Sequence, residues 1–204
     1  MDMDIRKATN ADVGSIVEIH KAAFEKFFLT SLGSRFLELY YSTFINSDKG
    51  VVYCAVDNDE IVGFSATSYI SKGFNACLIK ENFVKYAVES ILLLFTKPKA
   101  ILRLAKNMDK ESKDAAVKDD GLYAELYSIA VKPGNQGSGI GNKLLIATEE
   151  DVAKHNSKIS LTTDYSNNEK TIGFYHSLGY QDYYEFVTYP NRSMWRMIKS
   201  LSEI

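Results

Sequence analysis

The stretch Val131-Lys132-Pro133-Gly134-Asn135-Gln136-Gly137-Ser138-Gly139-Ile140-Gly141 joins a strand-like run to a segment with helical periodicity. Its alternate glycines let the backbone of the loop come close to a ligand. The first turn of a helix has unpaired N–H groups and the positive end of the helix dipole. This strand–loop–helix unit therefore predicts a site for a phosphate or a pyrophosphate.

Two common nucleotide-binding loops do not fit this stretch. A Walker A loop has glycine directly before its lysine, but Asn142 precedes Lys143, and no serine or threonine follows to hold magnesium. A dinucleotide fingerprint needs its third glycine or alanine three residues after the second, and that position is again Asn142. The residues alone leave open a glycine-rich turn that binds no ligand.

Length and composition are typical of a globular protein. The chain has 204 residues, of which 46% are hydrophobic and 25% are charged, and we expect one domain over residues 1–204. Its 24 basic and 26 acidic side chains nearly balance, which disfavours disorder and nucleic-acid binding. The longest strongly apolar run, residues 91–95, is far shorter than the ~20 residues that span a bilayer, so no stable membrane insertion is expected.

Export signals and metal-binding motifs are not found in the sequence. No apolar segment of signal-peptide length lies near the N-terminus, which favours a cytoplasmic location. The two cysteines, Cys54 and Cys77, do not have the spacing of a zinc site, so we expect structural thiols and no metal.

Periodicity and turn residues predict an α/β (α+β) fold with mostly antiparallel strands. Thr9 and Asp12 have the spacing of a capping box ahead of an amphipathic helix. Asp57-Asn58-Asp59-Glu60 is typical of a hairpin turn. The first part of the chain is then expected to contain a strand at 3–8, helices at 13–27 and 35–45 with a break at 29–33, and strands at 51–56 and 61–70.

Residues 71–120 differ in character and are expected to be a helical insertion between the third and fourth strands. Within them, 83–95 and 100–105 have helical patterns that are separated at Lys97-Pro98, because proline interrupts a helix. The elements expected after the insertion are a strand at 122–131, a helix at 140–155, a strand at 159–163, a helix at 169–178, and strands at 180–189 and 194–198.

Two motifs resemble those of one enzyme family. Gln136-Gly137-Ser138-Gly139-Ile140-Gly141, preceded by Val131 and Pro133, resembles the Q/R-x-x-G-x-G/A signature of the GNAT superfamily of acetyl-CoA-dependent N-acetyltransferases. Asn168, Phe174-Tyr175 and Leu178-Gly179-Tyr180 resemble the family segment N-x(5)-F-Y-x-x-L-G-F/Y. The resemblance covers nearly the whole chain except residues 71–120, and it implies a mixed, mostly antiparallel central sheet flanked by helices. Asn135 departs from the family pattern, because many relatives have an aromatic or basic residue there.

The resemblance also implies roles for individual residues. Acetyl-CoA would be the co-substrate, and its pantetheine arm would pair with Ile129, Ala130 and Val131 as an added strand. The Val131 N–H would polarise the thioester carbonyl. Tyr175 would donate a proton to the departing thiolate. The remaining implied contacts to acetyl-CoA are Gln136, Gly137, Ser138, Gly139, Ile140 and Gly141 on the pyrophosphate, and Asn168, Phe174 and Tyr175 on the arm.

A small-molecule primary amine is the expected acceptor, and it would attack the thioester directly in a ternary complex. Glu125 is the candidate general base, because an acid in an apolar strand needs a polar cleft or an exposed edge. Phe28, Tyr40 and Asp164 are the candidate acceptor contacts, and Asp164 is also the second candidate for the general base. The aromatic stretch at 24–33 resembles helix-pair segments of GNAT members from bacterial surface-glycan pathways, which implies an amino sugar.

Two other functions remain open from the sequence. Basic residues of the insertion flank the apolar residues 91–95, which suits a membrane-surface or partner-binding module. The same fold also permits a catalytically silent regulator that binds CoA. The aromatic helices near the N-terminus are compatible with a homodimer.

Overall fold

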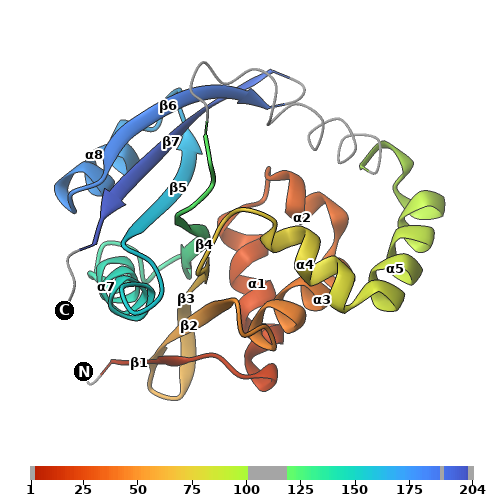
Figure 1. Ribbon diagram of the computed structural model, residues 1–204. Coiled ribbons are helices and arrows are strands. Elements are labelled where there is room, and N and C mark those ends of the chain that lie inside the picture. The colour runs from red at the N-terminus through yellow and green to blue at the C-terminus, as the bar shows by residue number, and fades with distance from the viewer. Residues whose placement is uncertain (1–2, 101–118, 189–190, 202–204) are drawn as a thin grey trace.

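The computed structural model describes residues 3–100, 119–188 and 191–201. Their strands form one seven-stranded sheet in the order β1-β2-β3-β4-β5-β7-β6 (Figure 1). Only β4 and β5 pair in parallel; the other neighbours within this sheet are antiparallel. The strands are β1 (Asp4–Lys7), β2 (Gly50–Asp57), β3 (Glu60–Ser68), β4 (Ala124–Val131), β5 (Lys158–Asp164), β6 (Gln181–Thr188) and β7 (Arg192–Ser200).

The hairpin β2–β3 begins the central part of the sheet. Asn58 and Asp59 at its turn have φ values of 49° and 62°. Two consecutive positive φ values are typical of a type I′ turn, which matches the twist of the flanking strands. The predicted turn chemistry of residues 57–60 is therefore confirmed.

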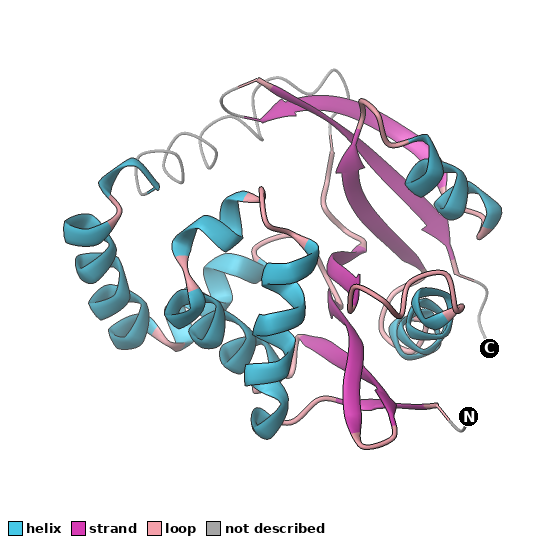
Figure 2. Ribbon diagram, turned by 180° about the vertical axis from the view of Figure 1, so that it is seen from behind, coloured by secondary structure: helices cyan, strands magenta, loops and turns pink. Residues whose placement is uncertain are grey.

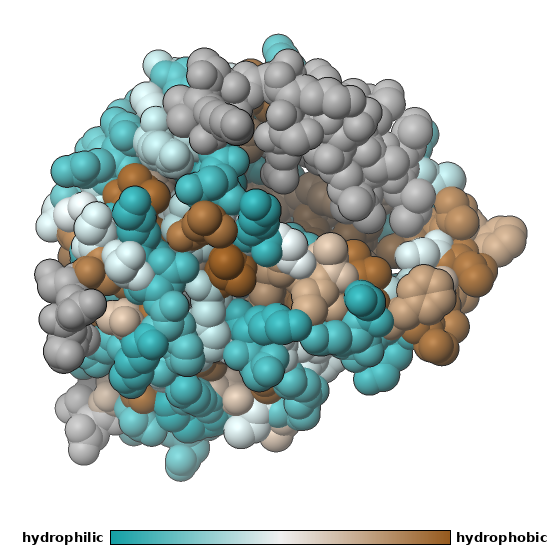
Figure 3. Space-filling view, in the orientation of Figure 1, coloured by the Kyte–Doolittle hydropathy of each residue, from teal (hydrophilic) through white to brown (hydrophobic). Residues whose placement is uncertain are grey.

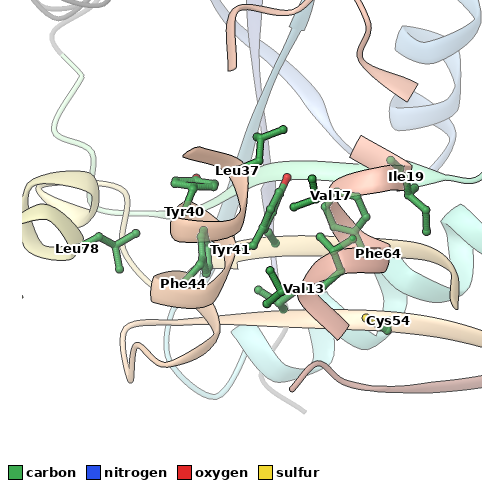
Figure 4. Close-up of a cluster of buried hydrophobic side chains, with 14 of the residues drawn as sticks. Val13, Val17, Ile19, Leu37, Tyr40, Tyr41, Phe44, Cys54, Phe64 and Leu78 are labelled. Atoms are coloured by element: carbon green, nitrogen blue, oxygen red, sulfur yellow. The ribbon is translucent and has the colours of Figure 1, made fainter. Parts of the chain in front are cut away.

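Helices α1 (Val13–Ala23) and α3 (Ser34–Ile45) cover one side of the sheet. The predicted capping box is present at the short 3-10 turn η1 (Asn10–Asp12), where the Thr9 N–H donates to the Asp12 carboxylate at 2.7 Å. The Arg6 guanidinium also bonds to Asp12 and holds the pKa of that carboxyl far below its ordinary value. Side chains from both helices and from β2 and β3 form the first apolar cluster (Figure 4).

Helices α7 (Ile140–Val152) and α8 (Glu169–Ser177) lie on the other side of the sheet, as Figures 1 and 2 show. They contribute to a second apolar cluster with β4, β5 and β7. Gly179 follows α8 and has a φ of 88°. A glycine just after the end of a helix commonly has such a positive φ, in agreement with the predicted end of this helix. The sheet is therefore covered by helices on both sides, which confirms the predicted fold class.

Two short helices were not predicted. α2 (Phe28–Leu32) forms where we expected a break, because Leu32 is buried and the Thr30 hydroxyl donates to the Phe24 carbonyl at 2.7 Å. α4 (Phe74–Glu81) forms because Phe74 and Leu78 pack against the first apolar cluster. Tertiary packing decides both helices, since a helix this short is marginal by itself.

The insertion after β3 contains α4 and α5 (Phe83–Thr96), and α5 agrees with the helix predicted at 83–95. The helix predicted at 100–105 lies almost wholly outside the described residues. None of the described helices is both long and apolar enough to cross a bilayer.

Candidate active site

The two central strands of the sheet separate partway along their length. β4 pairs with β5 only from Ala124 to Leu126, opposite residues 159–161 of β5. β3 stays paired with β4 up to Val131, and β5 stays paired with β7 up to Asp164. The last residues of β4 and of β5 therefore each have one paired edge and one edge that faces a gap between them.

A β-bulge lies where this separation begins. Leu126 pairs with Thr67 and Ser128 pairs with Ala66, so Tyr127 is the extra residue on β4. A bulge bends its strand and increases the local twist. It therefore directs the end of β4 away from β5.

Backbone groups of β4 after the bulge point into the gap. The Lys132 N–H donates to the Val62 carbonyl of β3 at 2.8 Å. Because successive N–H groups along a strand point to opposite edges, the Val131 N–H points away from β3 and towards the gap. The Ile129 N–H has the same direction. This edge can pair with an extended ligand as a further strand would.

The glycine loop follows β4 directly and ends at the N-terminus of α7. Gly134, Gly137 and Gly139 have φ values of 96°, 81° and 81°. Apart from the glycine itself and its two chain neighbours, no atom of the described residues lies within 4 Å of the position that a Cβ would take at any of the three. α7 also has no side-chain cap at this end. The loop therefore combines open space with unpaired backbone donors, which is what an anion requires.

The charges around this loop suit a phosphate group. No acidic residue occurs between Val131 and Thr148, and Lys132 and Lys143 flank the glycines. Lys132 forms an ion pair with Glu60 on β3, whereas the Lys143 side chain is exposed in the first turn of α7. In the described parts of the chain, no group of histidine, cysteine and acidic side chains could hold a metal ion.

The second motif lies across the gap, after β5. Asn168 precedes α8, and its Nδ2 donates to Thr163 Oγ1 and to the Asp164 carbonyl at 2.7 and 3.0 Å. These bonds attach the start of α8 to the end of β5. The motif asparagine therefore supports the wall of the gap opposite the edge of β4.

Tyr175 lies in the second apolar cluster, to which Ile129 and Phe174 also belong. Its ring is 5.3 Å from that of Phe174 and 5.5 Å from that of Tyr180. Burial raises the pKa of the Tyr175 phenol to about 12. The phenol is therefore protonated throughout the neutral range.

Glu125 lies on β4 just before the bulge, and it is only 9% exposed. Arg196 Nη1 donates to its Oε1 at 3.0 Å. The Ser71 hydroxyl donates to its Oε2. Glu125 therefore has polar partners, but they lie inside the protein rather than in an open cleft or at an exposed edge, and both carboxylate oxygens are engaged. A free carboxylate in a water-filled cleft would have been the simpler arrangement.

Arg196 is the centre of a buried polar cluster that connects four segments. Its guanidinium contacts Tyr184 on β6 at 3.0 Å and Ser160 on β5 at 3.3 Å, besides Glu125. Burial alone would lower the pKa of Arg196, but Glu125 and the neighbouring tyrosines hold it above its ordinary value. The arginine therefore stays charged inside the protein.

Asp119 joins the same cluster from the segment before β4. Its Oδ2 lies 3.7 Å from Arg196 Nε and accepts hydrogen bonds from the hydroxyls of Tyr123 and Tyr184. Burial opposes ionisation of Asp119, but these hydrogen bonds and Arg196 outweigh it and lower its pKa. The segment that leads from the insertion into β4 is therefore held next to Arg196, the partner of Glu125.

The residues predicted to contact the acceptor have different surroundings. Asp164 ends β5 and forms a two-pronged ion pair with Arg192, whose guanidinium lies 4.3 Å from the centre of the Phe27 ring. Phe28 begins α2 and follows Phe27 directly in the chain. Tyr40 is 8% exposed and packs on Phe44 and Tyr41 in the first apolar cluster, so its surroundings are those of a core residue.

Sequence reasoning missed Arg196 and its partners. Arg196 lies between Trp195 and Met197 in a terminal strand. A charged residue within an apolar run is the same signal that identified Glu125, so the sequence could have indicated this arginine. Ser71 and Asp119 carried no such signal, because polar residues near loops are common. Only the pairing of distant strands brings these side chains together.

Several solved structures share this fold at low sequence identity. The ribosomal-protein-alanine N-acetyltransferase from Brucella melitensis has a TM-score of 0.63 and 17% identity, with 97% of this chain and 99% of that chain covered. The ribosomal-protein-S18-alanine N-acetyltransferase from Escherichia coli has a TM-score of 0.62 and 16% identity, over 98% and 95% of the two chains. The PaiA N-acetyltransferase from Thermoplasma acidophilum, solved with coenzyme A, has a TM-score of 0.59 and 13% identity, over 98% and 99%.

A sequence profile identifies the family independently of these structures. No curated protein matches the chain. The profile of the Acetyltransferase (GNAT) family matches residues 15–180, which include the glycine loop and the segment from Asn168 to Tyr180. Because this match covers most of the sequence and both motifs, the chain belongs to the GNAT family of acetyltransferases.

Proposed function

We propose that this protein transfers the acetyl group of acetyl-CoA to a primary amine, within one acetyltransferase domain formed by residues 1–204. The observation that carries the proposal is the continuous path from the unpaired edge of residues 129–131 into the uncapped glycine loop. An extended arm that ends in a pyrophosphate matches both parts of this path. The coenzyme A complex of the PaiA structure supports the same ligand class.

In this proposal the chain binds acetyl-CoA mainly through its backbone. The N–H groups of residues 136–141 hold the pyrophosphate, with the α7 dipole favouring its negative charge. Ile129, Ala130 and Val131 pair with the pantetheine arm, and Asn168 and Phe174 line its opposite side. The co-substrate supplies a thioester, whose carbonyl oxygen accepts a hydrogen bond from the Val131 N–H. This hydrogen bond should lower the activation free energy by roughly 3 kcal/mol if it is stronger in the transition state than in the ground state.

Tyr175 is proposed to donate a proton to the departing sulfur. As the C–N bond to the amine forms and the C–S bond breaks, negative charge develops on sulfur. A phenol with a pKa of about 12 is protonated and can donate a hydrogen bond to this charge. Complete proton transfer is helped because the apolar surroundings that raise the pKa of the phenol also raise that of a thiol. Solvent then restores the proton of Tyr175.

Glu125 is proposed to accept the proton that the amine loses. Its Oε1 is neutralised by Arg196, so the reactive oxygen is Oε2, which faces the Ser71 hydroxyl. Ser71 can accept the amine proton while it donates its own to Glu125, which relays the proton without moving either side chain. Glu125→Gln should then lower kcat and shift the pH–rate profile. Ser71→Ala should lower kcat less; an unchanged kcat and profile in Glu125→Gln would assign the base elsewhere.

The acceptor is proposed to be a small primary amine, with an amino sugar as the first candidate. Phe27 and the Arg192–Asp164 ion pair lie together near the end of β5, Phe28 follows Phe27 in the chain, and an aromatic face beside charged groups suits a sugar ring with hydroxyls. The two ribosomal-protein-alanine acetyltransferases of similar fold make an N-terminal alanine peptide the natural competitor in a screen. The Asp164–Arg192 pair would select hydroxyl or carboxylate groups in either case.

The deciding experiment has two stages. Calorimetric titration with acetyl-CoA first tests whether the co-substrate binds. In thermal unfolding alongside it, a ligand concentration of about 100 times Kd should raise the unfolding free energy by roughly 2.7 kcal/mol. A free-thiol assay with amino sugars, alanine peptides and polyamines then tests turnover. Binding without thiol release for any amine would favour a CoA-binding regulator. No binding would reject the proposed function.

A further inference from the structure

Helix α5 carries its largest apolar side chains on the outside of the protein. Val84, Ile91 and Phe95 are 73%, 55% and 85% exposed, and Phe83 is 66% exposed. With Val88 between them, positions 84, 88, 91 and 95 form one stripe at helical spacing. Figure 3 shows these brown side chains gathered over α5 at the edge of the molecule. A contiguous apolar patch of this kind marks an interaction surface.

The inward side of α5 is attached partly through polar groups. The Arg35 Nε donates to Glu89 at 2.6 Å, and the hydroxyls of Tyr86 and Thr43 lie 2.8 Å apart. Lys97 Nζ donates to the Ser31 carbonyl at 2.8 Å. The one acidic residue of this helix therefore points inward, while its apolar stripe faces outward. Tyr86 and Leu93 also pack inward. The helix therefore has apolar side chains on both sides, whereas an ordinary surface helix keeps its apolar side chains on the face that packs on the core.

The charges that surround the stripe are positive. Residues 72–100 contain five lysines and two glutamates. Both glutamates are engaged, because Glu81 pairs with Lys49 and Glu89 pairs with Arg35. The exposed lysines around the stripe are Lys80, Lys85, Lys97 and Lys99. The patch is basic although the whole chain has a net charge of −2.

We propose that α5 and the end of α4 dock this protein on the surface of an anionic lipid bilayer. An apolar stripe framed by lysines is the pattern of a helix that lies in the interface, where side chains enter the acyl boundary and lysines meet the headgroups. The 14 residues of α5 are too few to span a bilayer, so the contact is peripheral. A two-fold dimer through this helix would instead bring the lysines of both copies together.

This orientation leaves the glycine loop accessible. Figures 1 and 2 both show α7 and α5 at opposite ends of the molecule. With α5 on the bilayer, α7 therefore lies at the far end of the molecule from it. Membrane docking is thus independent of the proposed acetyl-CoA site, and either can fail without the other.

Co-sedimentation with vesicles tests the docking surface. The wild-type protein should bind vesicles that contain 30% phosphatidylglycerol at low salt, bind phosphatidylcholine vesicles weakly, and dissociate as salt rises. Ile91→Ser should weaken binding at least about tenfold, since a buried isoleucine is lost from the contact. The matched control is Ile146→Ser on α7, because Ile146 is 46% exposed and Ile91 is 55% exposed. This control should bind as the wild type does.

Charge reversal tests the lysines separately. Lys85→Glu should lower the affinity for anionic vesicles by about tenfold or more, because each basic residue near the surface contributes ~1 kcal/mol. Lys158→Glu, at the exposed start of β5, should leave the affinity nearly unchanged. Thermal unfolding with acetyl-CoA checks that every variant is folded.

Three results would overturn the proposal. One is a folded wild-type protein that does not bind anionic vesicles even at low salt. Another is equal binding by Ile91→Ser and Ile146→Ser. The third is a dimer in light scattering that Ile91→Ser dissociates, which would assign the stripe to a second copy of the chain.

Discussion

Arg196 on β7 reaches across β5 to Glu125 on β4, with 3.0 Å between Nη1 and Oε1. β5 lies between these strands, and its Ser160 accepts a hydrogen bond from the same Nη1 at 3.3 Å. The guanidinium is therefore held where β4 and β5 are still paired, next to the point at which they separate. This bridge fixes the base of the gap and orients the carboxylate that we propose as the proton acceptor.

Removing the arginine should destabilise the protein strongly. Arg196→Met leaves Glu125 buried without its cation, and breaking such a pair costs about 3–5 kcal/mol of unfolding free energy. The double variant Glu125→Gln/Arg196→Met removes the stranded charge and should recover much of this loss. Urea unfolding at pH 7 measures both.

The control is a more exposed ion pair, that between Arg192 and Asp164. The Arg192 and Asp164 side chains are 28% and 35% exposed, so Arg192→Met should cost less than about 1 kcal/mol. Equal stability of the single Arg196→Met variant and the double variant would show that Glu125 is not left as an uncompensated buried charge.

A negative charge in the glycine loop should abolish binding of acetyl-CoA. Gly139→Asp adds a carboxylate where the pyrophosphate is proposed to bind, and it places a side chain at φ 81°. We expect Kd to rise at least about 100-fold by calorimetry, from charge repulsion and the loss of space. The matched control is Gly14→Asp, in the first turn of α1, which should leave Kd unchanged. Similar Kd values for the two variants would contradict the assignment of the loop.

Loss of the Tyr175 hydroxyl should lower turnover without affecting binding. Tyr175→Phe keeps the ring in its apolar cluster, so the fold and Kd for acetyl-CoA should be preserved, while kcat should fall about 10²-fold if the phenol assists the leaving sulfur. Steady-state thiol release measures this. Tyr180→Phe changes the neighbouring ring, 5.5 Å away, and should retain wild-type kcat. A retained kcat in Tyr175→Phe would show that its role is packing.

Buried His20 should make the protein less stable in mild acid. Its Nδ1 lies 2.7 Å from the Tyr41 hydroxyl, and burial lowers the pKa of the imidazole to about 4. Between pH 6.5 and 4 the unfolded chain binds a proton that the folded protein excludes. Stability should therefore fall as the pH drops through this range, by up to about 3 kcal/mol from this residue.

Urea unfolding at a series of pH values isolates the effect. His20→Gln should flatten the stability profile between pH 4 and 6.5, whatever its stability at pH 7. His155→Gln removes an exposed imidazole instead and should keep the wild-type slope. A wild-type slope in His20→Gln would mean that other groups cause the acid sensitivity.

Much of the fold could be predicted because local patterns were strong. The hairpin at 57–60, the capping box at Thr9 and Asp12, and the strand–loop–helix unit at 131–141 each depend on neighbouring residues, and the structure contains all three. α2 and α4 could not be predicted, because their stability depends on Leu32, Phe74 and Leu78 reaching a core formed by distant segments. The glycine loop was found from sequence because glycine has a unique backbone freedom. The buried position of Arg196 and its pairing with Glu125 were missed because its partners come from other strands.

The order of residues alone determines the glycine loop, the alternation of the strands and the family to which the chain belongs, since these depend on backbone conformation and on spacing along the chain. Tertiary structure alone decides that β4 separates from β5 after Leu126, that Arg196 neutralises one oxygen of Glu125, and that α5 turns its apolar stripe outward. The physical reason is that burial and electrostatic pairing depend on which segments meet in space, and the periodicity of one segment does not contain that information.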